Sequence, residues 1–132
     1  MRTTVCVTGA DERPVPLPAE FRYTMADPYA VRLSLGTPLA PPVEWAFARS
    51  LLADGLRRTS GTGDVVVFPR SPGRPDAVRI LLIRPKGTAA LDVATASVTT
   101  LLELADALVP PGTEHDHIDL DYVAEQLTAG LD

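Results

Sequence analysis

Hydrophobic and polar positions alternate over short stretches in the first two thirds of the chain, as they do in half-buried β-strands. The clearest case is residues 30–35 (AVRLSL), where apolar side chains occupy every second position. Residues 77–84 are so rich in Val, Ile and Leu that both faces of this strand are expected to be buried. Further strands are predicted at residues 3–7, 21–24, 43–47, 65–68 and 89–93.

Proline and glycine mark the breaks between these strands. Pro14, Pro16 and Pro18 predict an irregular approach to the strand at 21–24, because proline cannot donate a hydrogen bond to a neighbouring strand. Asp27 and Pro28 predict a turn, since a residue before proline avoids the helical region. Loops or turns are also predicted at residues 36–42, 70–76 and 85–87.

The strand at residues 43–47 carries the only tryptophan of the chain, Trp45. Val43 and Phe47 lie on the same face of that strand, because alternate residues share a face. Two interpretations of Trp45 are open, a place in the core or a contact point for a partner protein. Its apolar neighbours favour the core.

After Phe47 the spacing of apolar residues changes from that of a strand to that of a helix. Residues 48–54 predict one to two helical turns, with Gly55 in the left-handed conformation that often ends a helix. Gly61, Gly63 and Asp64 predict a turn into the next strand, in which glycine supplies a positive φ and Asp64 bonds its own backbone. The turn is not a phosphate loop, because no lysine follows and the next element is a strand.

Two helices are predicted in the last third of the chain. Residues 94–108 show an apolar stripe made by Val98, Leu101, Leu102, Ala105 and Leu108. The sequence Val-Pro-Pro-Gly at residues 109–112 ends this helix. A second helix is predicted at residues 119–129, and Asp119 at its start suits the positive end of the helix dipole.

The order of these elements predicts the fold class. Antiparallel strands, a short helix, three more antiparallel strands and two helices make an α+β domain with short connections. A chain of 132 residues fits one domain, so residues 1–132 are expected to fold as a single unit.

The composition excludes several classes of protein. The single cysteine, Cys6, cannot form a disulfide within the chain, and its valine neighbours indicate a structural thiol in a strand. The sequence has no run of about 18 apolar residues, so no transmembrane helix is expected. The first residues lack the apolar segment of a secretory signal, so a cytoplasmic location is expected.

Charge is distributed unevenly along the chain. Residues 1–86 carry 12 Lys and Arg against 8 Asp and Glu, a net charge of +4. Residues 87–132 carry 9 acidic and no basic residues, a net charge of −9, which brings the total to −5. The acidic third fits either the solvent faces of two amphipathic helices or a surface that attracts basic partners.

The only histidines, His115 and His117, alternate with Glu114 and Asp116. The cluster invites comparison with a metal site, but no second group of ligands completes a four-coordinate shell, and a solvated loop is favoured. The serines lack the Gly-x-Ser-x-Gly motif of a hydrolase nucleophile. The sequence therefore predicts no catalytic, metal or cofactor site.

Basic side chains gather on and beside the hairpin formed by residues 65–84. Such a patch would suit a partner protein or a single-stranded nucleic acid, or it is simply a solvated surface. The aromatic content of 5% and the net charge of −5 disfavour nucleic acid. The candidate partner-binding residues are Arg70, Arg74, Arg79 and Arg84 in this patch, and Glu114, Asp116 and Asp119 in the acidic third.

Four short blocks, in a fixed order, resemble the SsgA-like family of sporulation and cell division proteins of actinobacteria. They are ADPYAV at 26–31, VEWAFAR at 43–49 continued by LLADGL at 51–56, GTGDV at 61–65 continued to Pro69, and VPPGTE at 109–114. These blocks contain the residues expected to be structural, which are Asp27, Pro28, Trp45, Phe47, Gly55, Gly61, Gly63 and Asp64.

The resemblance implies a strongly bent antiparallel sheet of about seven strands with a short helix and two C-terminal helices, similar in shape to Whirly proteins and assembled as a homotrimer. It also implies a non-enzymatic regulator of sporulation-specific cell division. Such a regulator selects septum sites, recruits the tubulin-like protein FtsZ or a paralogous SsgA-like protein, and influences septal peptidoglycan. A single-stranded nucleic-acid-binding module of Whirly-like shape is the alternative.

Overall fold

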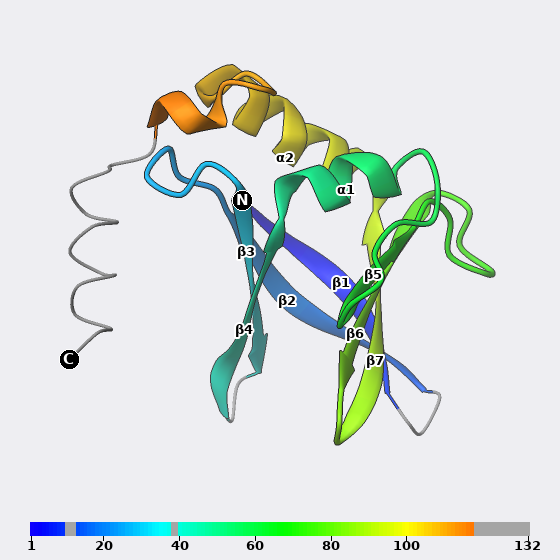
Figure 1. Cartoon of the computed structure of the whole chain (residues 1–132). Helices are drawn as coiled ribbons and strands as arrows, with labels where there is room; N and C mark the ends of the chain where they lie inside the picture. Colours follow the sequence, from blue (N-terminus) through cyan, green and yellow to red (C-terminus); the bar gives the residue numbers. More distant parts are fainter. Residues whose placement is uncertain (10–12, 38–39, 118–132) are drawn as a thin grey trace.

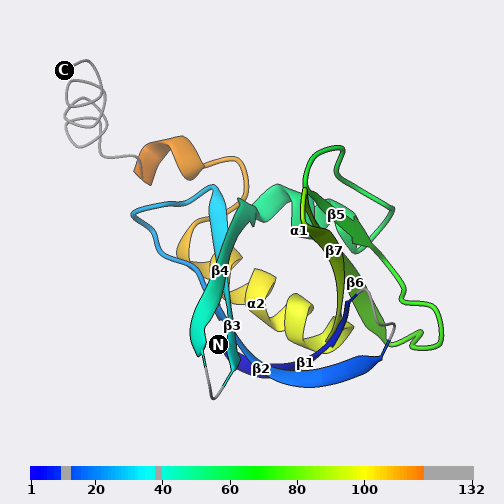
Figure 2. The ribbon, with the colours of Figure 1, turned by 90° about the horizontal axis from the view of Figure 1, so that it is seen from below.

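A single, strongly curved antiparallel sheet dominates the structure, a computed structural model that describes residues 1–9, 13–37 and 40–117. Its seven strands lie side by side in the order β4-β3-β2-β1-β7-β6-β5. The sheet curls into an open barrel, which is clearest along the barrel axis (Figure 2). The strands are β1 (Arg2–Thr8), β2 (Pro14–Arg22), β3 (Ala30–Thr37), β4 (Ala40–Ala48), β5 (Val65–Phe68), β6 (Ala77–Arg84) and β7 (Gly87–Ala94).

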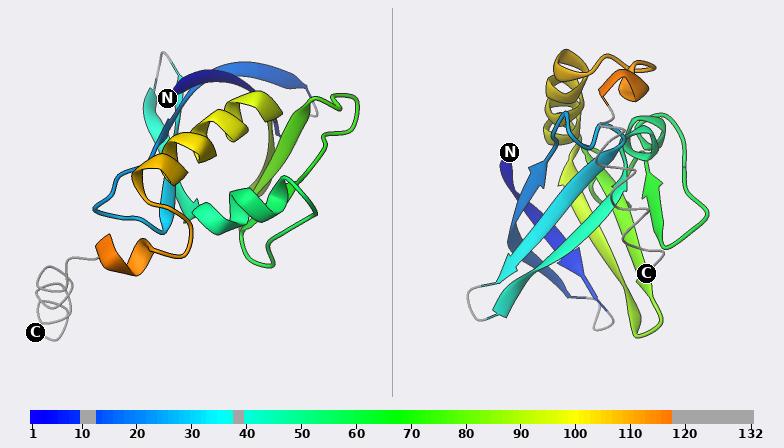
Figure 3. Two further views of the ribbon diagram at one scale, coloured as in Figure 1. Left: turned by 90° about the horizontal axis from the view of Figure 1, so that it is seen from above. Right: turned by 60° about the vertical axis from the view of Figure 1, so that its left-hand side comes forward.

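Two helices complete the barrel. Helix α1 (Arg49–Gly55) connects the two edge strands, β4 and β5, across the gap where the sheet does not close (Figure 1). Helix α2 (Thr95–Leu108) lies across one end of the barrel (Figure 3). A short 3₁₀ helix, η1 (Glu114–His117), follows. The predicted helix at residues 119–129 lies outside the described residues.

The predicted strand pattern gives the barrel its core, because alternate side chains of each strand point inward. Val31 and Leu33 of β3 and Ile80 of β6 are completely buried, and helix α2 adds Val98 from its apolar stripe. Leu108, predicted as part of that stripe, is instead 48% exposed, because it lies at the end of α2 beyond the sheet.

The expectation that β6 is buried on both faces was wrong. Its inward residues Val78, Ile80 and Leu82 are buried, while Arg79 and Leu81 are half-buried and Ile83 is exposed. The sheet forms a barrel whose core lies on one side, so only one face of β6 is packed. Apolar composition alone does not distinguish such a strand from one that is covered on both faces.

The prediction of an irregular segment at Pro14, Pro16 and Pro18 was also wrong. These prolines belong to β2 and pair along β1, in register with Thr8, Cys6 and Thr4. Because they alternate, their missing N–H groups all fall on one side of the strand. Strand β3 pairs only with residues 19–22 of β2, so the proline half of β2 forms hydrogen bonds with one neighbouring strand, β1, and needs no donors on its other side.

The predicted loop at residues 36–42 is mostly strand. Strand β3 continues to Thr37 and β4 begins at Ala40, so that β4 contains Pro41 and Pro42. The pairing shifts register between Leu35 and Thr37, which places the two prolines opposite Gly36 in a bulge. An edge strand with a bulge is where a sheet tolerates proline.

Gly55 does not have the left-handed conformation expected of it. It is the last residue of α1, and the following residue, Leu56, continues the right-handed backbone with φ −71° and ψ −22°. A Cβ atom at Gly55 would lie 2.6 Å from the Cβ of Val67 in β5. The glycine is therefore required by the close approach of helix and strand.

Gly61 has the positive φ expected in the turn before β5, with a value of 106°, whereas Gly63 is not among the glycines with positive φ. Ser60, next to this turn, pairs with Val67 on the outer side of β5 through two backbone bonds of 2.8 and 2.9 Å. The predicted bond from the Asp64 side chain to its own backbone is not formed. Asp64 instead accepts a hydrogen bond at its main-chain carbonyl from the Ile83 N–H, at 2.8 Å.

No helix within residues 1–9, 13–37 and 40–117 combines the length and apolar character needed to cross a bilayer.

Candidate functional site

Arg49, the first residue of α1, joins three parts of the chain at the end of the barrel that α2 covers. The guanidinium is buried, and its Nη2 donates to the Val109 carbonyl at 2.6 Å and to Asp106 Oδ1 at 2.9 Å. Its Nη1 donates to the Tyr23 hydroxyl at 2.7 Å. The backbone N–H of Arg49 also donates to the Tyr29 carbonyl, at 2.8 Å.

The turn predicted at Asp27 and Pro28 is held by this arrangement. The Tyr23 hydroxyl donates to the carbonyl of Pro28 at 2.9 Å, and Pro28 is buried. Arg49 therefore fixes α1, the loop between β2 and β3, and the end of α2 relative to one another. The sequence analysis missed this role, because a lone arginine after a strand has no pattern that distinguishes it from a surface residue.

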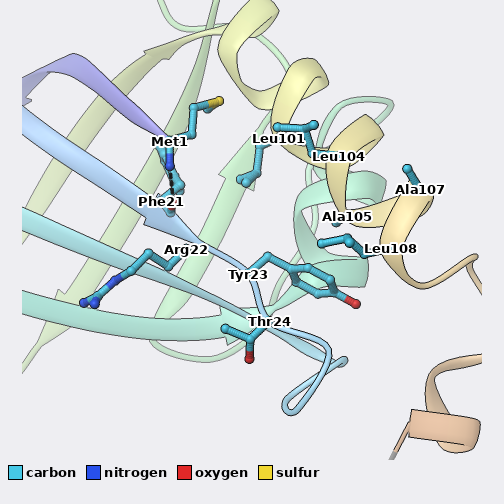
Figure 4. Close-up of a pocket in the computed structure, with 10 residues that line it drawn as sticks. All are labelled: Met1, Phe21, Arg22, Tyr23, Thr24, Leu101, Leu104, Ala105, Ala107 and Leu108. Carbon is cyan, nitrogen blue, oxygen red and sulfur yellow. Dashed lines mark hydrogen bonds between the residues drawn. The ribbon is translucent and has the colours of Figure 1, made fainter.

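Next to Arg49 an apolar groove of about 560 Å³ runs between α2 and the end of β2 (Figure 4). Leu104 and Leu108, one helical turn apart, are 55% and 48% exposed. Met1 forms the other side, where its amino group donates to the Phe21 carbonyl at 2.7 Å. The residues that line the groove are Met1, Phe21, Arg22, Tyr23, Thr24, Leu101, Leu104, Ala105, Ala107 and Leu108.

The groove has the chemistry of a contact surface and lacks the groups of a reaction site. Arg22 is its only charged side chain, and that guanidinium is already paired with Glu20 and Glu44, with the Glu44 carboxylate 3.0 Å away. No three His, Cys, Asp or Glu side chains of the described chain gather to hold a metal ion. Exposed apolar side chains in a groove mark places where proteins meet.

The basic hairpin predicted as a partner surface is organised around one buried carboxylate. Asp92 of β7 accepts two hydrogen bonds from Arg79 of β6, at 2.9 and 3.1 Å. Arg74 approaches the same carboxylate at 3.9 Å and donates to the sulfur of Cys6 at 2.8 Å. Two of the four predicted arginines are thus engaged within the protein.

The remaining predicted residues lie in different places. Arg70 and Arg84 are exposed. Glu114 accepts a hydrogen bond from the Gly112 N–H at 2.9 Å, and Asp116 lies 3.0 Å from His115 within η1. Glu114 and Asp116 therefore lie in a 3₁₀ helix, where the sequence favoured a solvated loop. Asp119 is outside the described residues.

The surroundings of Asp92 lower the pKa of its carboxyl group. Burial alone would raise the pKa, but the hydrogen bonds from Arg79 and the positive charges of Arg79 and Arg74 outweigh it. The Ser71 hydroxyl also lowers this pKa, although it lies outside ordinary hydrogen-bond geometry. The hydrogen bond with Asp92 in turn raises the pKa of the Arg79 guanidinium.

We expect replacement of Asp92 by Asn to reduce the free energy of unfolding at neutral pH by about 1–2 kcal/mol, because a charged pair is lost. A lowered carboxyl pKa stabilises the fold fully above the ordinary value of 3.8 and progressively less as the pH falls below it. The difference between the native chain and Asp92→Asn should therefore shrink in acid. Urea unfolding at a series of pH values measures it.

Glu44→Gln is the matched control, because Glu44 is an exposed carboxylate that also pairs with an arginine. We expect its effect to stay below about 1 kcal/mol at every pH. Equal losses for the two variants, or a difference for Asp92→Asn that grows in acid, would contradict the assignment.

Comparison with known proteins gives one consistent result. A family model described as Streptomyces sporulation and cell division protein, SsgA, matches residues 17–114. The sporulation-specific cell division protein SsgB of Streptomyces coelicolor is 45% identical over 120 residues, covering 91% of this chain and 88% of its own. SsgB of Thermobifida fusca is 41% identical over 119 residues, with 89% and 86% covered.

Solved structures agree with the sequence matches. A structure of SsgB, from work on longitudinal cell division during sporulation of Streptomyces coelicolor, superposes with a TM-score of 0.82 at 42% identity, covering 89% of this chain and 93% of that one. An SsgA-like sporulation-specific cell division protein from Thermobifida fusca superposes with a TM-score of 0.83 at 38% identity, with 96% and 93% covered. None of these matches supports the nucleic-acid alternative.

Proposed function

Because the chain belongs to the SsgA family of sporulation and cell division proteins, we propose that it acts as a non-enzymatic adaptor in sporulation-specific cell division. The observation that carries this proposal is its 45% identity to a sporulation-specific cell division protein across nearly the whole chain. The apolar groove beside α2 fits an adaptor, since it offers a contact surface and no reacting groups.

We propose that the adaptor works at division septa, where it helps to select the septum site, recruits FtsZ or a paralogous SsgA-like protein, and influences septal peptidoglycan. These steps require binding to other proteins and no chemistry on a substrate. The exposed arginines Arg70 and Arg84 and the acidic residues Glu114, Asp116 and Asp119 remain candidate contacts for such partners. Arg74 and Arg79 are weaker candidates, because Asp92 already engages them.

We further propose that copies of the chain meet through the groove and form a homotrimer of Whirly-like shape. Interfaces between identical subunits are more apolar than the rest of a protein surface, and Leu104 and Leu108 expose apolar side chains there. A trimer would display three copies of each partner contact, so that weak individual contacts add up to useful binding.

The test of the proposed function is complementation. A Streptomyces coelicolor strain that lacks its own SsgB, supplied with this chain, is expected to form sporulation septa again. Expression of the chain at the normal level without any septa would overturn the proposal. A two-hybrid assay against FtsZ and against SsgA-like paralogues then identifies the partner.

We expect Leu104→Glu to reduce septum formation in this assay by about tenfold or more, because a charge in an apolar contact costs more than 1.4 kcal/mol. Light scattering should show the same variant as a monomer. Ser50→Glu is the matched control, because Ser50 is exposed on α1 and does not line the groove. A Leu104→Glu protein that still forms oligomers would show that the groove is not the interface between copies.

A further inference from the structure

A second apolar hollow opens at the end of the barrel opposite α2. It has a volume of about 470 Å³ and is lined by residues of β1 to β4 on one side and of β6 and β7 on the other. Leu35 and Leu82 form its floor and are buried, whereas Val43 at its edge is 48% exposed. Mouths of small β-barrels are common places for ligands to bind.

The rim of this hollow carries positive charge. Arg84, at the end of β6, places its guanidinium 4.2 Å from the centre of the Trp45 ring, and Lys86 follows in the turn to β7. Neither side chain forms an ion pair within the described residues, whereas Arg22, Arg32 and Arg79 of the same sheet all do. The rim is a local positive region on a chain whose net charge is −5.

We propose that this hollow binds an acidic segment of a partner protein that presents one bulky apolar side chain. The apolar side chain enters the hollow beside Trp45, and neighbouring carboxylates pair with Arg84 and Lys86. The proposal rests on the adaptor function proposed above and names the chemistry of one partner. It concerns a different surface from the groove beside α2.

Charge decides between possible peptides. The guanidinium of Arg84 is held over an aromatic ring, where a cation is stabilised and its N–H groups remain free to bond a carboxylate. A basic segment would be repelled by Arg84 and Lys86. An uncharged apolar segment would fill the hollow and leave both cations without partners.

The only tryptophan of the chain, Trp45, lies in the wall of the hollow and reports on its occupancy. We expect the synthetic peptide Asp-Asp-Phe-Asp-Asp, added to the full chain at low salt, to change Trp45 emission saturably, with a dissociation constant of about 1 mM or lower. Replacing Phe of the peptide by Ala should weaken binding at least about tenfold, because the apolar anchor is lost. The peptide Lys-Lys-Phe-Lys-Lys should not bind.

In the protein, Arg84→Gln combined with Lys86→Gln should weaken binding about tenfold. Arg70→Gln is the matched control, because Arg70 is exposed on the loop between β5 and β6 and does not line the hollow. It should leave the affinity unchanged. Circular dichroism of each variant verifies that the fold is kept.

Three results would overturn the proposal. They are the absence of saturable binding, an affinity equal for acidic and basic peptides, and an affinity unaffected by the Arg84 and Lys86 replacements. Binding of dodecanoate with no response to the peptide would also overturn it, in favour of a small amphiphile. Because the experiment uses purified protein, its failure leaves the complementation test and the proposed adaptor function intact.

Discussion

Replacement of Arg49 by Met is expected to cost about 3 kcal/mol of the free energy of unfolding. Met keeps most of the buried aliphatic length but removes every donor. The Val109 carbonyl, 2.6 Å from the guanidinium, would then lie buried without its partner, and the Tyr23 hydroxyl would lose a hydrogen bond of 2.7 Å. Asp106 contributes less, because its side chain is 47% exposed and regains water.

Urea unfolding followed by the emission of Trp45 measures this loss. Arg57→Met is the matched control, because Arg57 is an exposed arginine just after α1 and forms no ion pair within the described residues. Its effect should stay within about 0.5 kcal/mol. Arg49→Lys, which keeps the charge but not the forked geometry, should fall between the two. Similar losses for Arg49→Met and Arg57→Met would show that the buried network contributes little.

Gly55→Ala is expected to cost about 2–3 kcal/mol, although alanine favours helices over glycine by about 1 kcal/mol. The added Cβ would lie 2.6 Å from the Cβ of Val67, which is completely buried in β5. Val67 cannot move away freely, so α1 must shift from the edge of the sheet. The methyl group of alanine therefore weakens the packing of α1 against β5.

Gly63→Ala provides the comparison, because no heavy atom lies within 4 Å of its added Cβ and its φ is not positive. We expect a change between zero and about 1 kcal/mol of stabilisation. Adding Val67→Ala to Gly55→Ala should restore room, so the double variant should lose less than the sum of the single variants by about 1 kcal/mol or more. Additive losses would mean that the clash is relieved elsewhere.

Where local pattern decides structure, the sequence was sufficient. The alternation at residues 30–35 predicted the buried side of β3, and the spacing of Val98, Leu101, Leu102 and Ala105 predicted the buried side of α2. The family blocks predicted the bent antiparallel sheet. Each of these features depends on side-chain period or on residues adjacent in the chain.

Where position in the sheet decides structure, the sequence was not sufficient. Pro16 and Pro42 read as loop residues, yet both lie in strands, because one faces an unpaired side and the other a bulge at an edge. Gly55 was predicted as a glycine that ends a helix, whereas it is required because Val67 packs against it. That contact joins two elements that are separate in the sequence and meet only in the folded chain. Arg49 likewise depends on Val109, 60 residues later.

Both edges of the sheet are partly blocked to further strands. Prolines and a bulge interrupt β4, and the backbone of Ser60 already occupies the outer side of β5. An open edge recruits strands from other copies and leads to aggregation when a protein is concentrated in one place. Contacts of this protein with other chains are therefore expected to be made by side chains, which can be released again.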